Sequence, residues 1–400
     1  MPNEVSLRIL SQLEPKDLNA VQMTSQTLHR FCQENTIWKS ICKRKWSLSP
    51  VFKRRCLPSW KEYYSRKMSL LNSVNGLCWI EISASGDKPS GRYQHTSTLI
   101  GQYIYYIGGQ KTAEERFDEI YRFDTVSHSF EKVELNSGPM PKFARHAAVG
   151  IDHNIYTFGG FDGFSKHYSL CMFDTIERTW NYIDCRGNLP IPRTNHAATA
   201  MDRSMYIFGG MYKNDAKELV FLNDLYRLDV DTLIWTRLFP SGDIPPPRCG
   251  HRLITLENKL LLFGGGSGPN WGRKFNDVHI YDPLMNHWTK VVVKGRVSVC
   301  TFSTCFNVGP FFFVYGGQSF HDDTLSNDLY MLDTVSMEWT RIETICAPYP
   351  RDMATGNMVG SNMYMFGGLR MDAENTILYL QMQDKIESLG IKYPSMSPLS

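Results

Sequence analysis

Apolar residues recur along most of the chain in short runs that end in a pair of glycines. Each run stands directly before its glycine pair, which is typical of a strand that is buried on both faces and ends in a tight turn. Six such strings follow one another, and their first glycines are 51, 50, 55, 52 and 51 residues apart. The strings are YIYYIGG, NIYTFGG, SMYIFGG, KLLLFGG, FFFVYGG and NMYMFGG, with first glycines Gly108, Gly159, Gly209, Gly264, Gly316 and Gly367.

Two further markers keep the same register between successive glycine pairs. An alternating segment follows each of the first five pairs and ends in an acidic residue suited to begin a turn, and an aromatic residue then opens another strand. The acidic residues are Asp124, Asp174, Asp229, Asp282 and Asp333. The aromatic residues are Phe130, Trp180, Trp235, Trp288 and Trp339. Short strands at this density, with a period of about 50 residues, predict the four-stranded blades of a β-propeller.

The strand led by Trp79 stands before the first glycine pair and therefore precedes the first complete repeat. From each aromatic residue to the next glycine pair the interval is 29, 29, 29, 29, 28 and 28 residues, and the first of these intervals belongs to Trp79. The sixth pair is followed by a third strand, TILYLQMQD, but by no aromatic-led fourth strand. We therefore expect the strand at Trp79 to complete the last blade and close the ring, which removes an open sheet edge.

The glycine pair, the acidic turn and the tryptophan occur in the order found in kelch repeats. Across residues 77–381 the sequence resembles the kelch-repeat family, and the resemblance implies a mainly β fold with six propeller blades. In kelch receptors the target commonly sits on the face formed by the loops that enter the inner strands and the loops that follow the glycine pairs. The entering residues by position are Gln94, Arg145, Asn195, Gly250, Phe302 and Met353. The candidate target-binding residues are Gln94, Gln110, Arg145, Phe161, Asn195, Met211, Trp271 and Gln318.

The first 46 residues have helical instead of strand periodicity. Apolar positions predict three short helices, over NEVSLRILSQL, KDLNAVQMTSQTLHRF and NTIWKSICKRKW, with Pro15 ending the first. Three short helices bury too little apolar surface to be stable alone, so this module is expected to complete its burial against a partner.

This segment resembles an F-box. The match runs without gaps through Pro2, Glu4, Ile9, Leu10, Leu13, Asp17, Leu18, Ile37 and Trp38. The chain departs from the family at Met1, where an opening leucine is usual, and at Leu28, where many members have tryptophan. The resemblance implies a substrate receptor of a Skp–cullin–RING ubiquitin ligase, with the F-box on the Skp-type adaptor and the propeller on a target protein. The expected adaptor-binding residues are Pro2, Ile9, Leu10, Leu13 and Leu18.

Charge divides the chain near residue 75. Residues 1–75 carry 13 Lys and Arg against 5 Asp and Glu, whereas the rest carries 30 against 35. The expected domains are an F-box (1–46), a basic helical linker (47–75), the propeller (76–385) and a tail (386–400). The basic runs at 43–45 and 53–55 suit a solvated helix face, a nuclear-import signal or a nucleic-acid contact. The negative propeller argues against nucleic acid as the main ligand.

Arginine and histidine also recur, 16 and 13 residues before the glycine pairs. The arginines are Arg92, Arg193, Arg248 and Arg351, and the histidines are His95, His146, His196 and His251. Because each histidine belongs to a different blade, the repetition favours a structural bond at the start of each blade over a metal site. The repeat that ends at Gly316 lacks both residues and is expected to be the irregular one.

The sequence contains no nucleophile elbow, phosphate loop or zinc-protease motif, so no catalytic residues, cofactor or metal are expected. Ten scattered cysteines without a CxxC pair favour free buried thiols in a reducing compartment, and no apolar run is long enough to span a membrane. We therefore expect a protein of the cytoplasm or nucleus. The alternatives are a kelch scaffold without a ligase role, whose helices pack only on its own propeller, and a radical-copper oxidase.

Overall fold

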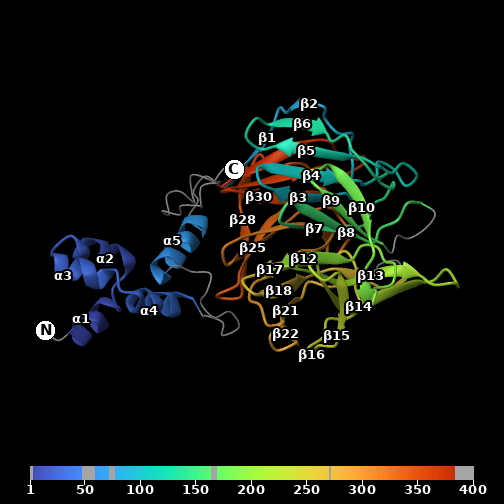
Figure 1. Cartoon of the computed structure of the whole chain (residues 1–400). Coiled ribbons are helices and arrows are strands. Elements are labelled where there is room, and N and C mark those ends of the chain that lie inside the picture. Colours follow the sequence, from blue (N-terminus) through green and yellow to red (C-terminus); the bar gives the residue numbers. More distant parts are fainter. Residues whose placement is uncertain (1–2, 47–58, 72–76, 164–168, 270–271, 383–400) are drawn as a thin grey trace.

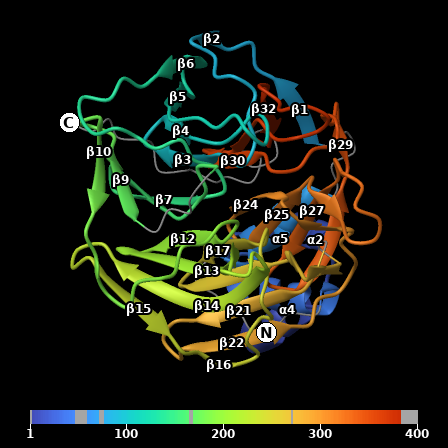
Figure 2. The ribbon, with the colours of Figure 1, turned by 90° about the vertical axis from the view of Figure 1, so that its right-hand side faces the viewer.

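The computed structural model describes residues 3–46, 59–71, 77–163, 169–269 and 272–382. A group of helices at the N-terminal end projects from one side of a large β structure (Figure 1). Seen from a direction at right angles, the sheets of this β structure are arranged in a ring (Figure 2). The fold is a six-bladed β-propeller with N-terminal helices, as the repeat pattern predicts.

Each blade is an antiparallel sheet of four principal strands that follow one another from the centre outward. The first contains β3 (Thr96–Ile100), β4 (Tyr103–Ile107), β5 (Ile120–Asp124) and β6 (Ser129–Lys132). The second contains β7 (Ala147–Ile151), β8 (Asn154–Phe158), β9 (Leu170–Asp174) and β10 (Thr179–Ile183). The third contains β12 (Ala197–Met201), β13 (Ser204–Lys213), β14 (Leu219–Asp229) and β15 (Ile234–Leu238). The fourth contains β17 (Arg252–Leu256), β18 (Lys259–Phe263), β21 (Val278–Asp282) and β22 (His287–Val291). The fifth contains β24 (Thr304–Val308), β25 (Phe311–Tyr315), β27 (Leu329–Asp333) and β28 (Glu338–Ile342).

The sixth blade joins the two ends of the propeller. It contains β30 (Thr355–Val359), β31 (Asn362–Phe366), β32 (Ile377–Gln381) and, as its outer strand, β1 (Leu77–Glu81). The antiparallel register of β1 and β32 pairs Trp79 with Leu380. The predicted ring closure is therefore confirmed, and β32 has no open edge.

Several two-residue strands connect or extend the blades. Four of them pair in parallel with the outer strand of the blade that follows. These four are β2 (Ser85–Gly86), β11 (Arg186–Gly187), β16 (Ser241–Gly242) and β29 (Thr344–Ile345). The other short strands are β19 (Gly266–Ser267), β20 (Arg273–Lys274), β23 (Val299–Thr301) and β26 (Gln318–Ser319).

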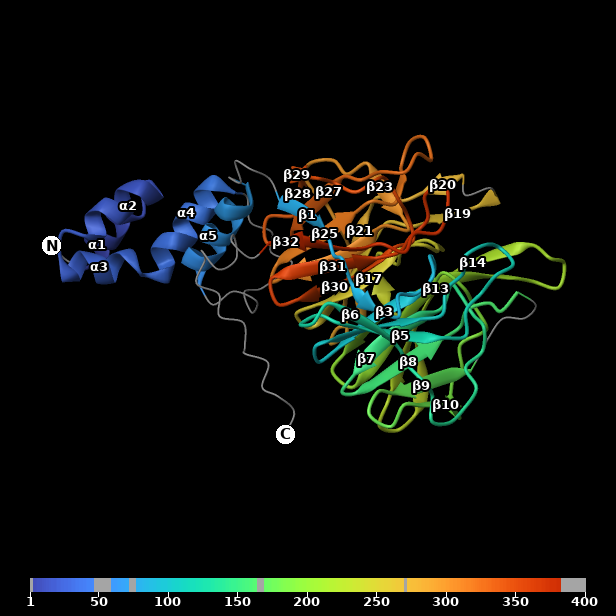
Figure 3. The ribbon, with the colours of Figure 1, turned by 90° about the horizontal axis from the view of Figure 1, so that it is seen from above.

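In five of the six blades the second strand ends directly before its glycine pair, where the backbone conformation and the close packing favour glycine. Gly108 has φ +60°, and a Cβ atom on it would lie 2.5 Å from the carbonyl oxygen of Phe143 in the next blade. In the third blade Gly209 and Gly210 also have positive φ, +62° and +94°, and the strand register shifts there, but β13 and β14 pair again beyond the glycines and form a hairpin arm. Residues 210–213 of β13 pair with residues 219–222 of β14 in this arm, and residues 214–218 connect the two strands. Figure 3 shows this arm on the side of the propeller away from the helices.

The N-terminal segment contains four helices instead of the predicted three. They are α1 (Asn3–Leu10), α2 (Pro15–Gln22), α3 (Gln26–Cys32) and α4 (Asn35–Lys45). The second predicted helix is divided at Ser25, whose side chain accepts a hydrogen bond from the backbone N–H of Leu28 and caps α3. A fifth helix, α5 (Trp60–Leu71), lies within the segment predicted as a basic linker. The predicted domain limits fall largely on residues outside the described ranges and stay predictions.

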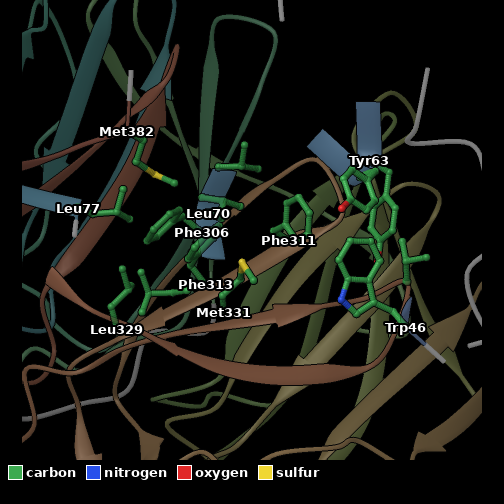
Figure 4. Packing of buried hydrophobic residues seen from close by; sticks show 14 of the residues in the cluster. Trp46, Tyr63, Leu70, Leu77, Phe306, Phe311, Phe313, Leu329, Met331 and Met382 are labelled. Carbon is green, nitrogen blue, oxygen red and sulfur yellow. The ribbon is translucent and has the colours of Figure 1, made fainter. Parts of the chain in front are cut away.

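One hydrophobic core joins the helices to the propeller. It contains Leu10 and Trp38 of the helical module, Tyr63 and Leu70 of α5, and buried residues of the fifth and sixth blades. Figure 4 shows Tyr63 beside Phe311 of β25, and their rings stack with centroids 6.2 Å apart. The helices therefore complete their burial partly against their own propeller.

Candidate functional site

Six residues, one from the start of each blade, form a ring at one end of the propeller channel. All six have a positive φ between 54° and 66°. They are Gln94, Arg145, Asn195, Gly250, Phe302 and Met353, the entering residues expected from the repeat. Five hydrogen bonds of 2.9–3.0 Å join them: from the second blade to the sixth, the backbone N–H of the entering residue donates to the carbonyl oxygen of its counterpart in the preceding blade. We call this end of the channel the mouth.

The side chains of five of these residues line a cavity of about 250 Å³ at the mouth, together with Met211 and Gln318. The lining combines one charged group, three amides and three apolar side chains. The full set is Gln94, Arg145, Asn195, Met211, Phe302, Gln318 and Met353. Such a mixture of apolar surface and a few fixed polar groups is common in binding sites.

The polar side chains of the mouth are held by specific hydrogen bonds. Nε of Arg145 donates to Oε1 of Gln94 at 2.9 Å. Gln318 accepts from Oγ1 of Thr301 at 3.1 Å and donates from Nε2 to Oδ2 of Asp352 at 2.9 Å. Burial raises the pKa of the Asp352 carboxyl to about 6, and Gln318 counters this through its hydrogen bond.

The structure brings together five of the eight predicted target-binding residues. Gln94, Arg145, Asn195, Met211 and Gln318 line the mouth cavity. Gln110 is almost fully buried and donates to the hydroxyl of Tyr93 at 2.7 Å instead. Phe161 is partly exposed beneath the guanidinium of Arg116, and Trp271 lies outside the described residues.

Arg116 and Asp352 contact the predicted residues Phe161 and Gln318 but were not themselves predicted from the repeat. Arg116 lies on the loop between β4 and β5, and its guanidinium lies over the ring of Phe161. Asp352 directly precedes the entering residue Met353, at a position occupied in the other blades by Tyr93, Ala144, Thr194, Cys249 and Thr301. That change of residue type was the available signal.

The recurrent arginines fix the glycine turns of their own blades, as predicted. In each case Nη1 donates to the carbonyl oxygen of the first glycine of the pair. The bonds are Arg92 to Gly108 (3.1 Å), Arg193 to Gly209 (2.9 Å), Arg248 to Gly264 (2.9 Å) and Arg351 to Gly367 (3.2 Å). Three of these arginines also form salt bridges: Arg92 with Glu119, Arg193 with Asp224 and Arg248 with Asp277.

The recurrent histidines fill the seams between blades. Nε2 of His146 lies 2.9 Å from Oγ1 of Thr96 in the preceding blade, and Nε2 of His95 lies 2.8 Å from Oγ1 of Thr355. A Cβ atom on Gly159 would lie 2.7 Å from the ring of His196. Among the described residues, no three His, Cys, Asp or Glu side chains are placed to hold one metal ion.

The helical module exposes part of its predicted adaptor-binding set. Ile9 is 50% exposed, and Val5, one helical turn earlier on α1, is 43% exposed. Leu10 and Leu18 are buried in the core of the module, and Leu13 is partly buried. Pro2 lies outside the described residues. The predicted set itself stays a prediction: of its described members Ile9 is exposed, and Val5 and Met23, which were not predicted, are further exposed apolar side chains of the module.

Helix α5 fixes this module to the fifth blade through a buried polar cluster. The hydroxyl of Tyr63 donates to Oδ2 of Asp333 at 2.6 Å, and Nζ of Lys67 lies 2.5 Å from the same oxygen. Ser336 donates to it as well, at 2.8 Å. Asp333 pairs with Phe311, the first residue of β25, whereas Gly316 follows the last residue of that strand. The helices and the mouth are therefore on opposite faces of the propeller.

No described helix is long and apolar enough to cross a membrane. The nine cysteines in the described part of the chain are free thiols.

Comparison with known proteins agrees with both parts of this architecture. The profile described as "KLHDC2/KLHL20/DRC7 Kelch-repeats domain" matches residues 61–265 and 250–389, and the "F-box-like" profile matches residues 1–44. The chain belongs to the kelch-repeat family and is an F-box/kelch protein.

Similar curated proteins share the repeats over part of their length. Host cell factor 2 of Homo sapiens is 29% identical over 325 residues, which are 75% of this chain and 33% of that protein. Kelch domain-containing protein 3 of Homo sapiens is 26% identical over 247 residues, 59% of this chain and 50% of that protein. Host cell factor of Drosophila melanogaster is 33% identical over 148 residues, 35% of this chain and 10% of that protein. The chain thus spans between a tenth and half of the length of these relatives.

Proposed function

We propose that this protein is the substrate receptor of a Skp–cullin–RING ubiquitin ligase. In this function the helical module binds a Skp-type adaptor, and the mouth of the propeller binds a target protein. The receptor performs no chemistry itself. It raises the effective concentration of target lysines near the ubiquitin-charged enzyme held elsewhere in the complex. The proposed place of action is the cytoplasm or nucleus.

One observation carries this proposal. An F-box-like module presents Val5 and Ile9 to solvent although the same module buries Leu10, Leu18 and Trp38. Residues four apart on a helix share a face, so Val5 and Ile9 form one apolar stripe that nothing in the described chain covers. An exposed apolar stripe on a module of this family suits an adaptor.

The experiment is co-purification of a Skp-type adaptor and cullin with the full chain from cells. We expect both to be recovered with the wild-type protein and lost with a double variant, Val5→Asp and Ile9→Asp. Exposed positions tolerate such changes, so the variant should fold. The matched control is Val126→Asp with Ile176→Asp, at exposed turn positions of the propeller. Equal recovery with all three proteins would exclude this adaptor surface.

The second candidate is a kelch scaffold without a ligase role. The docking of α5 on the fifth blade favours it, because the helices already contact their own propeller. A scaffold predicts that residues 3–46 resist proteolysis fully without an adaptor and that added adaptor changes nothing. A receptor predicts that the adaptor protects α1.

A further inference from the structure

The fifth blade lacks the arginine that fixes the glycine turn in four of the other five blades. Cys300 stands in its place, and its Sγ lies 3.7 Å from the carbonyl oxygen of Gln318. Within the described part of the chain, no side chain donates a hydrogen bond to the carbonyl oxygen of Gly316, whose counterparts in those four blades bind an arginine. The fifth repeat is therefore one buried guanidinium group short.

The acidic partner of the missing arginine is nevertheless present. Asp328 directly precedes β27, at the position that Glu119, Asp224 and Asp277 hold in the first, third and fourth blades. Its side chain is 26% exposed, against 10–17% for these three counterparts. A carboxylate has two oxygens and several acceptor sites, so Asp328 can accept further hydrogen bonds from a cation.

Arg341 does not replace the missing group. Its Nε and Nη2 donate to Oδ1 of Asp328 at 2.8 and 2.7 Å, but its side chain is 55% exposed. Lys132 holds the same register position in the first blade, where it lies 3.1 Å from Glu119 although the buried Arg92 binds that acid as well. The outer cation thus accompanies the buried arginine, and the fifth blade lacks only the buried one.

The aromatic surface that such an arginine covers is also present. The guanidinium of Arg193 lies over the ring of Tyr226, with Cζ 5.4 Å from the ring centroid, and binds Asp224 at the same time. Tyr330 is the counterpart of Tyr226, because each follows its acid by two residues. No lysine or arginine in the described ranges lies over Tyr330, whose hydroxyl donates to Oδ2 of Asp328 at 3.3 Å. A guanidinium over Tyr330 would therefore be placed to reach Asp328.

A cavity of about 410 Å³, which we call the inter-blade cavity, opens beside this tyrosine between the fourth and fifth blades. Tyr330, Trp339 and Phe320 give it three aromatic side chains, and it shares no lining residue with the mouth cavity. Arg296 lines it as well, but its side chain is exposed and forms no ion pair with any described residue. Aromatic faces attract guanidinium groups, and arginine also binds carboxylates through paired N–H donors.

We propose that the inter-blade cavity binds the side chain of an arginine from a partner protein, with Tyr330 beneath its guanidinium and Asp328 as its charge partner. The bound arginine takes the place of the one that the fifth repeat lacks. This contact goes beyond the proposed function, because it involves neither the mouth nor the helix that would bind the adaptor.

The test uses the full chain with its valine methyl groups labelled with carbon-13, so that Val293 and Val297 report on the inter-blade cavity by NMR. Two blocked five-residue glycine peptides are titrated, one with a central arginine and one with a central citrulline, which has nearly the same shape but no charge. We expect the arginine peptide to shift both valine signals saturably, with at least about tenfold higher affinity than the citrulline peptide.

Cys300→Arg restores the arginine of the repeat and should abolish binding, because the new guanidinium would occupy the proposed position. The matched control, Cys300→Ala, should bind the arginine peptide as the wild type does. Asp328→Asn tests the same contact without filling the cavity, and should remove the preference for arginine over citrulline. Its control is Glu343→Gln, since Glu343 is 77% exposed and also pairs with Arg341.

Equal affinity for the two peptides, or no shift with either, would overturn the proposal. Unchanged binding by a folded Cys300→Arg protein, or unchanged selectivity in a folded Asp328→Asn protein, would do the same. Adaptor binding by Asp328→Asn is measured in parallel and should equal that of the wild type, so failure here is distinct from failure of the receptor function.

Discussion

The ammonium group of Lys67 on α5 lies 2.5 Å from Oδ2 of Asp333 at the end of β27, and both side chains are almost fully buried, with 2% and 1% exposed. Asp333 is also the turn acid of its repeat, since its Oδ1 accepts the backbone N–H groups of Val335 and Ser336. The equivalent acid Asp229 accepts hydrogen bonds from Asp231 and Thr232 of its own turn, and from no other residue in the described part of the chain. The fifth blade has thus adapted a repeated turn residue to hold the helical module.

The first prediction concerns the stability of this contact. Asp333→Ala leaves Lys67 buried without its carboxylate partner, and we expect a loss of about 3–5 kcal/mol in the free energy of unfolding. Asp229→Ala, which removes turn bonds only, should cost about 1–2 kcal/mol. Urea denaturation of the two variants measures the difference, and equal losses would show that the buried pair adds nothing beyond the turn.

The second prediction concerns the closing strand. Three truncated chains are compared, beginning at Ser59, Leu77 and Ile82. The first keeps α5, the second keeps β1 without α5, and the third lacks both. We expect the Leu77 chain to remain folded but to be less stable than the Ser59 chain, because Phe311 loses its stacking contact with Tyr63 of α5.

The Ile82 chain should lose cooperative unfolding or aggregate, because β32 then has an open edge and the buried side chains of Leu77 and Trp79 are missing. Thermal unfolding followed by circular dichroism gives the answer. Similar melting of the Leu77 and Ile82 chains would contradict the role of β1 in closing the ring.

The repeated parts of this fold were predictable because every blade places the same kinds of residue at the same buried positions, at nearly the same spacing along the chain. Trp79 could be assigned to the sixth blade from its interval to Gly108 alone. The turn acids and the arginines at the start of four blades were predictable for the same reason.

The non-repeated features were not predictable in this way. Lys67 and Asp333 are 266 residues apart, and no local pattern links them. Ser25 divides α2 from α3 through one cap inside a continuous apolar periodicity. At the mouth, the register placed Arg145, but its hydrogen bond to Gln94 depends on how side chains from two blades meet.

The third prediction concerns acid sensitivity. Burial holds the pKa of His95, His196 and His251 well below the usual value, and lowers the pKa of His279 to about 4. Below about pH 6.5 the unfolded chain therefore binds more protons than the folded one, and the free energy of unfolding falls as the pH decreases toward the folded-state values. Each such histidine contributes up to about 1.4 kcal/mol per pH unit.

Asp352 acts in the opposite direction, because its raised pKa of about 6 favours proton uptake by the folded state. Four histidines outweigh one carboxyl, so we expect a net loss of stability between pH 7 and pH 5.5. Urea midpoints should show a weaker pH dependence for His251→Gln and an unchanged one for His321→Gln, at an exposed position. A protein more stable at pH 5.5 than at pH 7 would contradict this account.

The central claim, that the helical module is an adaptor-binding surface set apart from the mouth, is tested most directly by calorimetric titration of a purified Skp-type adaptor into the full chain. We predict a complex of one adaptor to one chain that is weakened at least about a hundredfold by Val5→Asp with Ile9→Asp, a loss of about 2.7 kcal/mol, and is unchanged by Arg145→Gln. No binding by the wild-type chain, or equal binding by the double variant, would contradict it.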